Sequence, residues 1–395
     1  MKVLVLNCGS SSLKYQLINM ENNDVLASGK YERIGEVESF IVHKALGRKI
    51  EIQNTALNHK EAIDFTLKQL VNKEYKVIES LNEIDAIGHR FVHGGENFTK
   101  SIVVSDKVVK DLEKIVNMAP LHNPASILGI KACLEVVPNK PMVIVFDTAF
   151  HQTIVKDKYL YPIPYSFYEK YGIRKYGFHG TSHNYVAQKY AEITNKPLEG
   201  TKIITCHLGQ GSSICAVKDG KSVDTSMGFT PLGGISMVTR SGDLDPSVVT
   251  GIMKYTGMTA DETENLLNKE SGVQGISGLV PDFREIETAS NNGHEFATVA
   301  LENFKYSIAG FIAKYAVCMG GLDAIIFTGG IGENQIKVRE DICNKLAFMG
   351  VKIDSALNNS RGEDKKVSKS DSSVEIYIIP TNEELMIARE TMDLV

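Results

Sequence analysis

The stretch TKIITCHLGQGSSICAVKDG, residues 201–220, decides the fold. It opens with an apolar run, Ile203 to Cys206, of the kind that forms a buried strand. A turn rich in glycine and serine follows, and a second apolar run, Ile214 to Val217, leads into Asp219-Gly220, a sequence typical of a hairpin turn. Glycines let backbone N–H groups approach an anion closely, and hydroxyls add donors. We therefore predict two strands around a phosphate-binding turn, with a third strand at Lys221 to Thr225.

The N-terminus repeats this plan. Residues 3–18 read as an apolar strand, a Gly/Ser turn and an alternating, half-buried strand. Further along, residues 85–95 and residues 323–330 each carry a strand that leads to a Gly-Gly pair. Two halves with the same order of parts predict a duplicated α/β fold that holds a nucleotide between its halves. The alternative explanation is chance similarity among short apolar strands.

The boundary between the two halves is expected near Asp147. No low-complexity linker separates the halves, so this boundary depends on the internal repeat. We predict an N-terminal lobe of residues 1–147 and a nucleotide-binding C-terminal lobe of residues 148–382. The last helix, residues 383–395, is expected to pack on the N-terminal lobe.

Composition excludes several classes of protein. The 395 residues carry a net charge of −5 and a pI near 6.1, which argue against a nucleic-acid partner, since such proteins present a basic surface. Six cysteines are scattered without a C-x-x-C pair, as in a reduced, cytoplasmic protein. Met1-Lys2 leads straight into a strand, so no signal peptide is expected. No apolar run approaches the ~20 residues of a membrane span, so no membrane partner is expected either.

Local signals predict several helices. Helix starts are expected at Asn123, as a cap before Pro124, at Asp245-Pro246 and at Asn382. The longest helix is predicted over residues 295–319, and it offers a face for dimerisation. Its apolar stripe is formed by Phe296, Val299, Phe304, Ile308, Phe311 and Ile312.

Three segments are predicted to be irregular. Residues 159–176 are rich in Tyr and Pro and read as a connector. Residues 228–245 read as a long polar loop, and residues 329–334 as a Gly-rich loop after a strand.

Charged residues stand where ligands bind in α/β proteins. Residues 141–146 read as a buried strand that delivers Asp147 at its carboxyl end, where ligands bind in open sheets. Arg90 lies at a strand end and Arg240 in a Gly-rich loop, where a fixed guanidinium can grip a carboxylate or a transferring phosphoryl group. The chain has neither a G-x-x-x-x-G-K-[ST] loop nor a G-x-G-x-x-G fingerprint. A P-loop enzyme and a dinucleotide dehydrogenase are therefore disfavoured.

Six motifs, spread over the whole chain and in the same order, resemble those of the acetate kinase family. They are Asn7-x-Gly9-Ser10-Ser11-Ser12-x-Lys14, Gly177-Phe178-His179-Gly180-Thr181-Ser182-His183, His207-x-Gly209-x-Gly211-x-Ser213, Thr239-Arg240-Ser241-Gly242-Asp243, Thr328-Gly329-Gly330-Ile331-Gly332-Glu333-Asn334 and Pro380-Thr381-Asn382-Glu383-Glu384. This family belongs to the superfamily of actin, sugar kinases and chaperone ATPases. The resemblance thus implies a duplicated actin-like (ribonuclease H-like) fold with a nucleotide cleft between two lobes. Gln210 departs from the family, which usually has Asn there.

The resemblance implies an ATP:acetate phosphotransferase. Such an enzyme reversibly transfers the γ-phosphoryl group of ATP to acetate and yields acetyl phosphate and ADP. The resemblance further implies Mg²⁺ as cofactor, with Mn²⁺ able to replace it, ATP or ADP as co-substrate, and a homodimer.

The resemblance also implies the site residues. Asp147, His179 and Arg240 are the catalytic residues, with the transition-state charge stabilised by Arg90, His179, Arg240 and Mg²⁺. Substrate binding is assigned to Arg90, Val92, Leu121, His122, Phe178 and Pro231. Nucleotide binding is assigned to Ser10, Ser12, Lys14, His207, Leu208, Gly209, Gln210, Gly211, Asp282, Phe283, Arg284, Gly330, Ile331, Gly332, Glu333 and Asn334. Metal binding is assigned to Asn7 and Glu383.

Structural and functional alternatives stay open. An acidic residue at a helix start favours the helix dipole, which alone would explain Glu383. His183, in the first turn of a helix, has the best purely structural explanation among the histidines. A propionate or butyrate kinase of the same family is an alternative, since one methylene in an apolar pocket is worth only ~1–3 kcal/mol. The other alternative is an actin-like ATP-binding module without acyl chemistry, which would have no reason to place Arg90, His179 and Arg240 around a small pocket.

Overall fold

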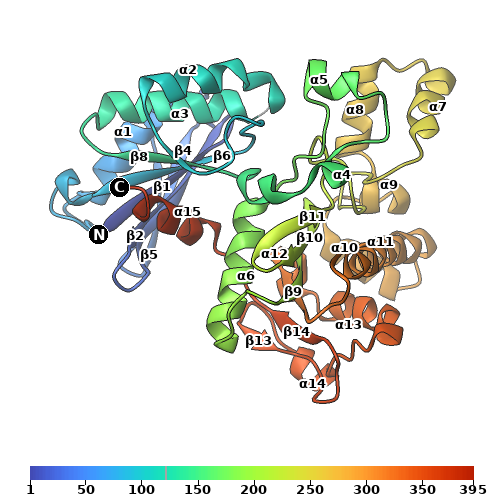
Figure 1. The fold of residues 1–395 in the computed structure, drawn as a ribbon. Coiled ribbons are helices and arrows are strands. Elements are labelled where there is room, and N and C mark those ends of the chain that lie inside the picture. Colours follow the sequence, from blue (N-terminus) through green and yellow to red (C-terminus); the bar gives the residue numbers. More distant parts are fainter. Residues whose placement is uncertain (121) are drawn as a thin grey trace. The chain divides into compact units, whose positions relative to one another are not determined.

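The computed structural model describes residues 1–120 and 122–395. The described chain divides into two compact units, here called the first unit and the second unit. The first unit comprises Met1–Phe150 and Asn382–Val395, and the second unit comprises His151–Thr381. Each unit contains one β-sheet with helices packed against it (Figure 1).

The first unit has an eight-stranded sheet in the order β5-β4-β3-β2-β1-β6-β8-β7. Its strands are β1 (Lys2–Cys8), β2 (Ser12–Asn19), β3 (Asp24–Glu32), β4 (Phe40–Ala45), β5 (Arg48–Gln53), β6 (Ala86–Phe91), β7 (Ile102–Val103) and β8 (Met142–Phe146). β1 and β2 form an antiparallel hairpin, whereas β1, β6 and β8 run parallel. Because parallel strands end at the same edge of a sheet, their carboxyl ends carry Asn7, Arg90 and Asp147 to one edge.

Helices close the core of the first unit. They are α1 (His59–Leu70), α2 (Asp106–Lys114), α3 (Asn123–Val136) and α15 (Glu383–Met392), with 3₁₀ turns at Leu81–Glu83 and Val116–Met118. All five residues of β8 are buried, as expected for a strand that is covered on both faces. α15 packs on β1, β6 and β8. Gly88 permits this contact, because a Cβ there would lie 2.5 Å from Thr391 Oγ1 and 2.7 Å from Ile387 Cγ2.

The second unit has a six-stranded sheet in the order β11-β10-β9-β12-β14-β13. Its strands are β9 (Lys202–Leu208), β10 (Ser212–Lys218), β11 (Lys221–Thr225), β12 (Ala324–Thr328), β13 (Lys365–Lys366) and β14 (Glu375–Ile378). β9 and β10 are antiparallel, and β12 lies parallel beside β9. This hairpin with a parallel neighbour repeats the arrangement of β1, β2 and β6, which confirms the predicted duplicated α/β fold.

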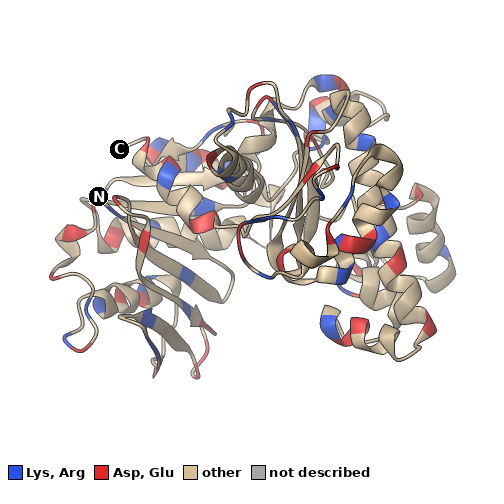
Figure 2. Ribbon diagram, turned by 90° about the horizontal axis from the view of Figure 1, so that it is seen from below, with Lys and Arg blue, Asp and Glu red and all other residues tan. Residues whose placement is uncertain are grey.

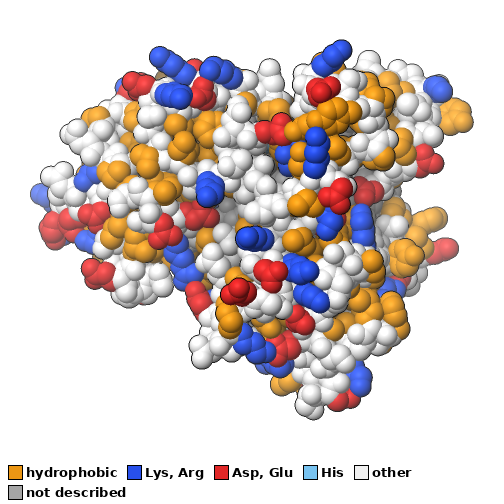
Figure 3. Space-filling model, viewed as in Figure 1, with side chains coloured by type: hydrophobic (Ala, Val, Ile, Leu, Met, Phe, Trp, Pro, Cys, Tyr) orange, Lys and Arg blue, Asp and Glu red, His pale blue; other side chains and the backbone are white. Residues whose placement is uncertain are grey.

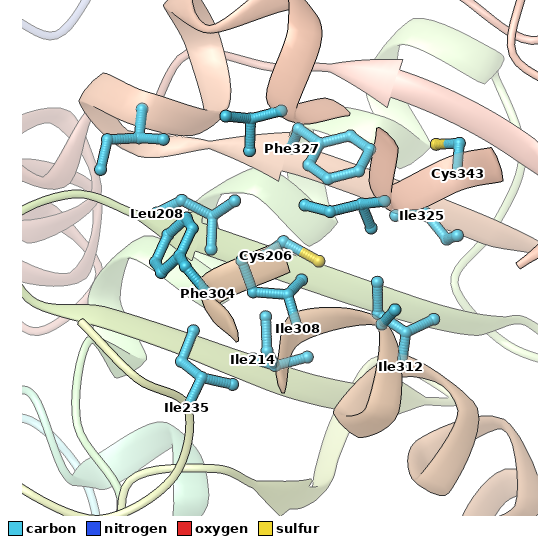
Figure 4. Close-up of a cluster of buried hydrophobic side chains, with 14 of the residues drawn as sticks. Cys206, Leu208, Ile214, Ile235, Phe304, Ile308, Ile312, Ile325, Phe327 and Cys343 are labelled. Atoms are coloured by element: carbon cyan, nitrogen blue, oxygen red, sulfur yellow. The ribbon is translucent and has the colours of Figure 1, made fainter. Parts of the chain in front are cut away.

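One long helix organises the core of the second unit. The helices are α4 (Lys156–Tyr159), α5 (Ser166–Tyr171), α6 (Gly180–Thr194), α7 (Pro246–Thr256), α8 (Ala260–Lys269), α9 (Gly272–Ser277), α10 (Phe283–Asn291), α11 (Glu295–Met319), α12 (Gly329–Asn334), α13 (Ile336–Lys345) and α14 (Ser355–Asn358). One 3₁₀ turn, Ala149–Thr153, spans the point in the chain where the first unit ends, and another lies at Ala347–Met349. Figure 4 shows Phe304, Ile308 and Ile312 of α11 facing side chains of β9, β10 and β12. This buried cluster packs α11 against β9, β10 and β12 and so supports the strands of the second unit.

The strongest local predictions are confirmed. The hairpin of residues 201–220 forms β9 and β10, and β11 covers the five residues expected of it. The longest helix spans the predicted residues 295–319. Asp245 and Asn382 cap α7 and α15, since their side chains accept hydrogen bonds from the backbone N–H groups of Ser247 and Leu385.

The apolar stripe predicted for α11 is exposed at its start and buried further along the helix. Phe296 and Val299 are 59 % and 48 % exposed, whereas Ala297 and Ala300 are fully buried. Small residues let the helix approach its neighbours closely, so the buried face is displaced by one residue there. The stripe is buried from Phe304 onward at Ile308 and Ile312 and partly buried at Phe311.

Asn123 begins α3 and does not cap it, contrary to the prediction. Its side-chain amide donates hydrogen bonds to the carbonyls of His93, at 3.1 Å, and Ile115, at 3.3 Å. These tertiary contacts compete successfully with the local cap.

Two of the three segments predicted to be irregular contain helices. Residues 329–334 form the short helix α12, and residues 159–176 contain α5. Residues 228–245 are irregular as predicted, but Ile235, Met237 and Val238 within them are fully buried. This loop therefore belongs to the packed interior of the second unit.

Acidic and basic side chains are mixed along the chain. Figure 2 shows both signs on most segments, and on the face drawn in Figure 3 they alternate with apolar and neutral surface. Among the described residues, no helix combines the length and apolar character that crossing a bilayer requires.

Candidate functional site

In the first unit, the parallel strand ends bring an arginine and an aspartate together. Arg90 lies near the end of β6, and Asp147 directly follows β8. The guanidinium donates two hydrogen bonds to the carboxylate, from Nε to Oδ1 at 3.1 Å and from Nη2 to Oδ2 at 2.5 Å. The Asp147 side chain is only 2 % exposed. Burial alone would lower the pKa of Arg90, but the charges of Asp147 and Glu383 raise it above its usual value, so the guanidinium keeps its charge.

Two further oxygen-bearing side chains face this pair. Asn7 Oδ1 accepts a hydrogen bond from Arg90 Nη1 at 3.4 Å, and Glu383 Oε2 lies 4.0 Å from Arg90 Nε. Burial raises the pKa of the partly exposed Glu383 to about 7; Arg90 opposes this rise and Asp147 adds to it. The first unit thus gathers three oxygen-bearing side chains around one arginine.

The Gly/Ser turns of the two units have matching surroundings. β1 and β9 share one burial pattern, in which four buried residues precede a half-buried Asn7 or His207. The turn between β9 and β10, residues 208–211, is here called the second turn. Gly209 N–H donates to Ser212 Oγ at 3.1 Å, which closes this turn. Asn7 and His207 therefore occupy corresponding positions of the duplicated fold.

Two stacked histidines lie beside the second turn. The ring centroids of His179 and His207 are 4.2 Å apart, with the planes tilted by 30°. His179 Nδ1 lies 2.9 Å from Ser213 Oγ, and His207 Nδ1 lies 2.7 Å from Ser182 Oγ. His179 has a φ of 55°, in the left-handed region that non-glycine residues seldom adopt, directly before α6. Strain of this kind persists only where the surroundings hold it, and it is frequent at functional sites.

Arg240 completes this group. A Cβ at Gly211 would lie 3.0 Å from Arg240 Nη1 and 3.7 Å from His179 Cε1, so the turn, the arginine and the histidine meet. The guanidinium contacts the carbonyl of Pro231 at 3.4 Å and the sulfur of Met237 at 4.0 Å. In the part of the chain that the structure describes, no carboxylate lies within ion-pair distance of Arg240, and burial lowers its pKa. A half-buried cation without a counter-charge favours a bound anion.

Backbone contacts hold the loop that carries Arg240. Asp243 Oδ1 accepts a hydrogen bond from Gly234 N–H at 2.7 Å, and Met237 N–H donates to the Arg240 carbonyl at 3.0 Å. Gly242 has a φ of 71°, and a Cβ there would lie 2.5 Å from the carbonyl oxygen of Ile235. Contacts within the loop itself therefore hold the backbone around Arg240 in place.

The helix α12 lies directly against the second turn. Gly329 has a φ of 76°, and a Cβ there would lie 2.7 Å from the Leu208 carbonyl oxygen. Glu333 Oε1 accepts hydrogen bonds from the N–H groups of Gly329, at 2.8 Å, and Thr381, at 3.2 Å. Glu333 thus anchors the start of α12 and the chain that leads to α15.

The predicted segment 282–284 lies on the other side of the turn. Gln210 Nε2 donates to the carbonyl of Pro281 at 3.3 Å. Asp282 and Arg284 form an ion pair at 3.1 Å and border a surface depression of about 560 Å³. Phe283 is buried and packs against an aromatic ring of α11, with centroids 5.3 Å apart. Its side chain therefore belongs to the core of the second unit.

The other predicted residues have simpler surroundings. In the first unit, Val92 is buried, Ser12 is half-buried, Ser10, Lys14 and His122 are exposed, and Leu121 lies outside the described residues. In the second unit, Phe178, Leu208, Ile331 and Gly332 are buried, Gly209, Gly211 and Pro231 are half-buried, and Gly330 and Asn334 are exposed.

Ser182, Ser213 and Thr381 contact the site but were not predicted as site residues. Both serines face imidazoles, and Thr381 Oγ1 lies 2.8 Å from Ser182 Oγ. Strand register offered one usable signal, since Ser213 pairs with His207 across β9 and β10. For Ser182, local sequence carries no sign of the ring that it contacts.

The whole chain matches a known protein family. The model of the acetokinase family matches residues 2–389. Acetate kinase from Thermoanaerobacterium thermosaccharolyticum is 56 % identical over 396 residues, covering 100 % of this chain and 99 % of the relative, and that of Thermoanaerobacter pseudethanolicus is 55 % identical with the same coverage.

Solved structures agree with this match. The crystal structure of Porphyromonas gingivalis acetate kinase superimposes with a TM-score of 0.97 at 46 % identity, covering 100 % of this chain and 99 % of that one. A propionate kinase from Francisella tularensis gives a TM-score of 0.91 at 43 % identity, with both chains fully covered. Since the family model, the full-length identity and the superposition all agree, the chain belongs to the acetokinase family.

Proposed function

We propose that this protein reversibly transfers the γ-phosphoryl group of ATP to acetate, giving acetyl phosphate and ADP. The observation that carries the proposal is the group in the second unit: a Gly/Ser turn, two stacked histidines, and an arginine with no carboxylate of the described residues beside it. Phosphoryl transfer depends on positioning and on stabilising charge in a loose transition state, and this group supplies both. Relatives named acetate kinase, 55–56 % identical over the full chain, support acetate as the acceptor.

An acetate-dependent hydroxamate assay tests this function. With ATP and Mg²⁺, the acyl phosphate trapped by hydroxylamine should form only when acetate is added. ATP turnover that is indifferent to acetate would instead support an ATP-binding module without acyl chemistry.

The reaction needs no base from the protein. Acetate is ionised at neutral pH, since its pKa is near that of Glu, ~4.3. Both oxygens of Asp147 are engaged by Arg90, so we assign Asp147 to hold that arginine and Arg90 to the carboxylate of the substrate. His179 and Arg240 are assigned to the transferring phosphoryl group.

The oxygen-bearing side chains of the first unit fit magnesium. Asn7 and Glu383 offer the hard oxygen ligands that Mg²⁺ prefers. Among the described residues, no three His, Cys, Asp or Glu side chains could hold a metal by themselves. This suits Mg²⁺, which keeps several waters and binds through one or two carboxylates and the phosphates of a substrate. We assign Mg²⁺, replaceable by Mn²⁺, to Asn7 and Glu383; when bound, it would offset the charge of the phosphates.

The nucleotide is assigned to the second turn and the segments beside it. Residues 208–211 and α12 lie in contact, and Gln210 links the turn to the segment that begins α10. Because Phe283 is buried in the core, Asp282 and Arg284 are the side chains of that segment that can meet a ligand.

Activity is expected to fall stepwise as the carboxylic acid substrate becomes longer. We expect kcat/KM to be highest with acetate, about tenfold or more lower with propionate and lower again with butyrate, because one methylene in a small apolar pocket is worth ~1–3 kcal/mol. Steady-state rates with the three acids at saturating ATP measure this order. A higher kcat/KM with propionate would make the chain resemble the Francisella tularensis relative in substrate and would refute acetate as its preferred acceptor.

We propose that the protein is a homodimer formed through the exposed face of α11. Phe296, Val299, Tyr306 and Val317 recur at helical spacing and are 48–83 % exposed. Exposed apolar stripes of this kind mark association surfaces. We expect Val299→Glu combined with Tyr306→Glu to yield a monomer by size-exclusion chromatography with light scattering. Lys254→Glu, an exposed change on α7, should leave the dimer intact, and a dimeric double variant would exclude this face.

We also infer a cytoplasmic location. All six cysteines lie among the described residues, and none of them forms a disulfide. Five are buried, as is usual for reduced thiols inside a cytosolic protein. Fractionation of cells that produce the protein would test this location.

A further inference from the structure

A buried chain of hydrogen bonds leads from β9 to His179. Thr205 Oγ1 lies 2.7 Å from His183 Nδ1, and His183 Nε2 lies 2.7 Å from Ser213 Oγ. Ser213 Oγ in turn lies 2.9 Å from His179 Nδ1. The side chains of Thr205, His183 and Ser213 are each fully buried, so bulk water does not complete their hydrogen bonds.

The direction of the first bond follows from the protons available. A hydroxyl has one proton, and a neutral imidazole has one N–H and one accepting nitrogen. Within the described chain, the one side-chain partner of Thr205 Oγ1 is His183 Nδ1. If His183 donated to Thr205, the hydroxyl proton of Thr205 would be buried without an acceptor, which costs free energy. Thr205 therefore donates, and the proton of His183 lies on Nε2.

The remaining bonds then have one favourable direction. His183 Nε2–H donates to Ser213 Oγ, and the proton of Ser213 is directed to His179 Nδ1. His179 consequently accepts at Nδ1 and carries its own proton on Nε2. Burial, together with the nearby His151 and His207, lowers the pKa of His183 well below its usual value, so that His183 keeps a single proton.

We propose that His183 is a positioning residue that, through Ser213, holds His179 as the neutral tautomer with its proton on Nε2. This inference rests on the proposed function, in which His179 acts on the transferring phosphoryl group. The tautomer matters because an Nε2–H donates a hydrogen bond to a phosphoryl oxygen, whereas an unprotonated nitrogen would repel it. A purely structural role would explain why His183 is buried. It would not explain why the hydrogen bonds from Thr205 through His183 and Ser213 all point toward His179.

Nitrogen-15 NMR of the histidine side chains tests the tautomer directly. The full-length protein is measured without nucleotide or acetate, and the His179 signals are assigned by their loss in His179→Gln. We expect an unprotonated Nδ1 and a protonated Nε2 at His179. A proton on Nδ1, or exchange between both nitrogens, would overturn the inference. Because this measurement requires no turnover, its failure is distinct from a failure of the hydroxamate assay.

Two variants of His183 test whether this residue sets the tautomer of His179. Glutamine can accept from Thr205 with its amide oxygen and donate to Ser213 with its amide nitrogen, whereas leucine can do neither. We expect His183→Leu to release the His179 tautomer and to lower kcat about tenfold or more, as is typical when an outer partner of a site residue is lost. KM for ATP should change little, and His183→Gln should retain the tautomer and most of kcat.

Thermal unfolding shows whether each variant folds. If His183→Leu does not fold, Ser213→Ala provides the same comparison, because it removes the hydroxyl between the two rings. Equal losses of kcat in the leucine and glutamine variants, with the His179 tautomer unchanged, would reduce His183 to a structural residue and refute the inference.

Discussion

Replacing Arg240 by alanine is expected to lower kcat by about a hundredfold or more while the protein remains folded. The guanidinium is half-buried and, among the residues described, has no carboxylate partner, so its charge is available to an anion. It lies beside Gly211 and His179, where charge develops in the proposed transfer. Stopped assays of acetyl phosphate formation at saturating ATP and acetate measure the loss.

Arg240→Lys is the matched control for this prediction. Lysine keeps the positive charge but lacks the planar fork that binds a phosphoryl group through two donors, so intermediate activity is expected. The charge of Arg240 contributes no ion pair to the described fold, and the thermal unfolding temperature should therefore change little in either variant. A loss of only a few-fold in Arg240→Ala would remove Arg240 from the catalytic group.

Replacing Asp147 by alanine is expected to destabilise the first unit by about 3–5 kcal/mol, because it leaves the largely buried charge of Arg90 without its main partner. Both carboxylate oxygens accept hydrogen bonds from Arg90, and Glu383 at 4.0 Å can replace only part of that interaction. Urea unfolding followed by a probe in the first unit measures the change in the free energy of unfolding.

The double variant Arg90→Ala with Asp147→Ala measures how much the two side chains stabilise the protein through their interaction with each other. Removing both side chains leaves neither member of the pair without the other, so the double variant should be more stable than the sum of the two single losses predicts. Additive losses would mean that the two side chains do not stabilise each other. Asp147→Asn, which keeps the shape and one accepting oxygen, is expected to fall between the wild type and Asp147→Ala.

Local sequence was sufficient for much of the fold. The strands of residues 201–220 and the bounds of α11 are confirmed because apolar runs, glycine-containing turns and helical spacing act over a few residues. The helix starts predicted at Asp245 and Asn382 are confirmed for the same reason, since each side chain caps its helix by bonding to backbone two or three residues away. The duplication could be predicted because both hairpins repeat one order of parts.

Wherever a side chain had a partner distant in sequence, local signals were insufficient. Asn123 bonds to carbonyls outside its helix and so does not cap it, and the neighbours of α11 select a buried face that leaves Phe296 exposed. Residues 329–334 form a helix in which Glu333 also accepts a hydrogen bond from the N–H group of Thr381, 48 residues away.

The sequence by itself determined the strands, the turns, the repeat and the identity of the charged residues near strand ends. Only the tertiary structure decided that Arg90 pairs with Asp147, 57 residues away, and that Ser213 stands between His179 and His183. The physical reason is that backbone patterns arise from neighbours in the chain, whereas the partner of a buried polar group is chosen by whichever element packs against it.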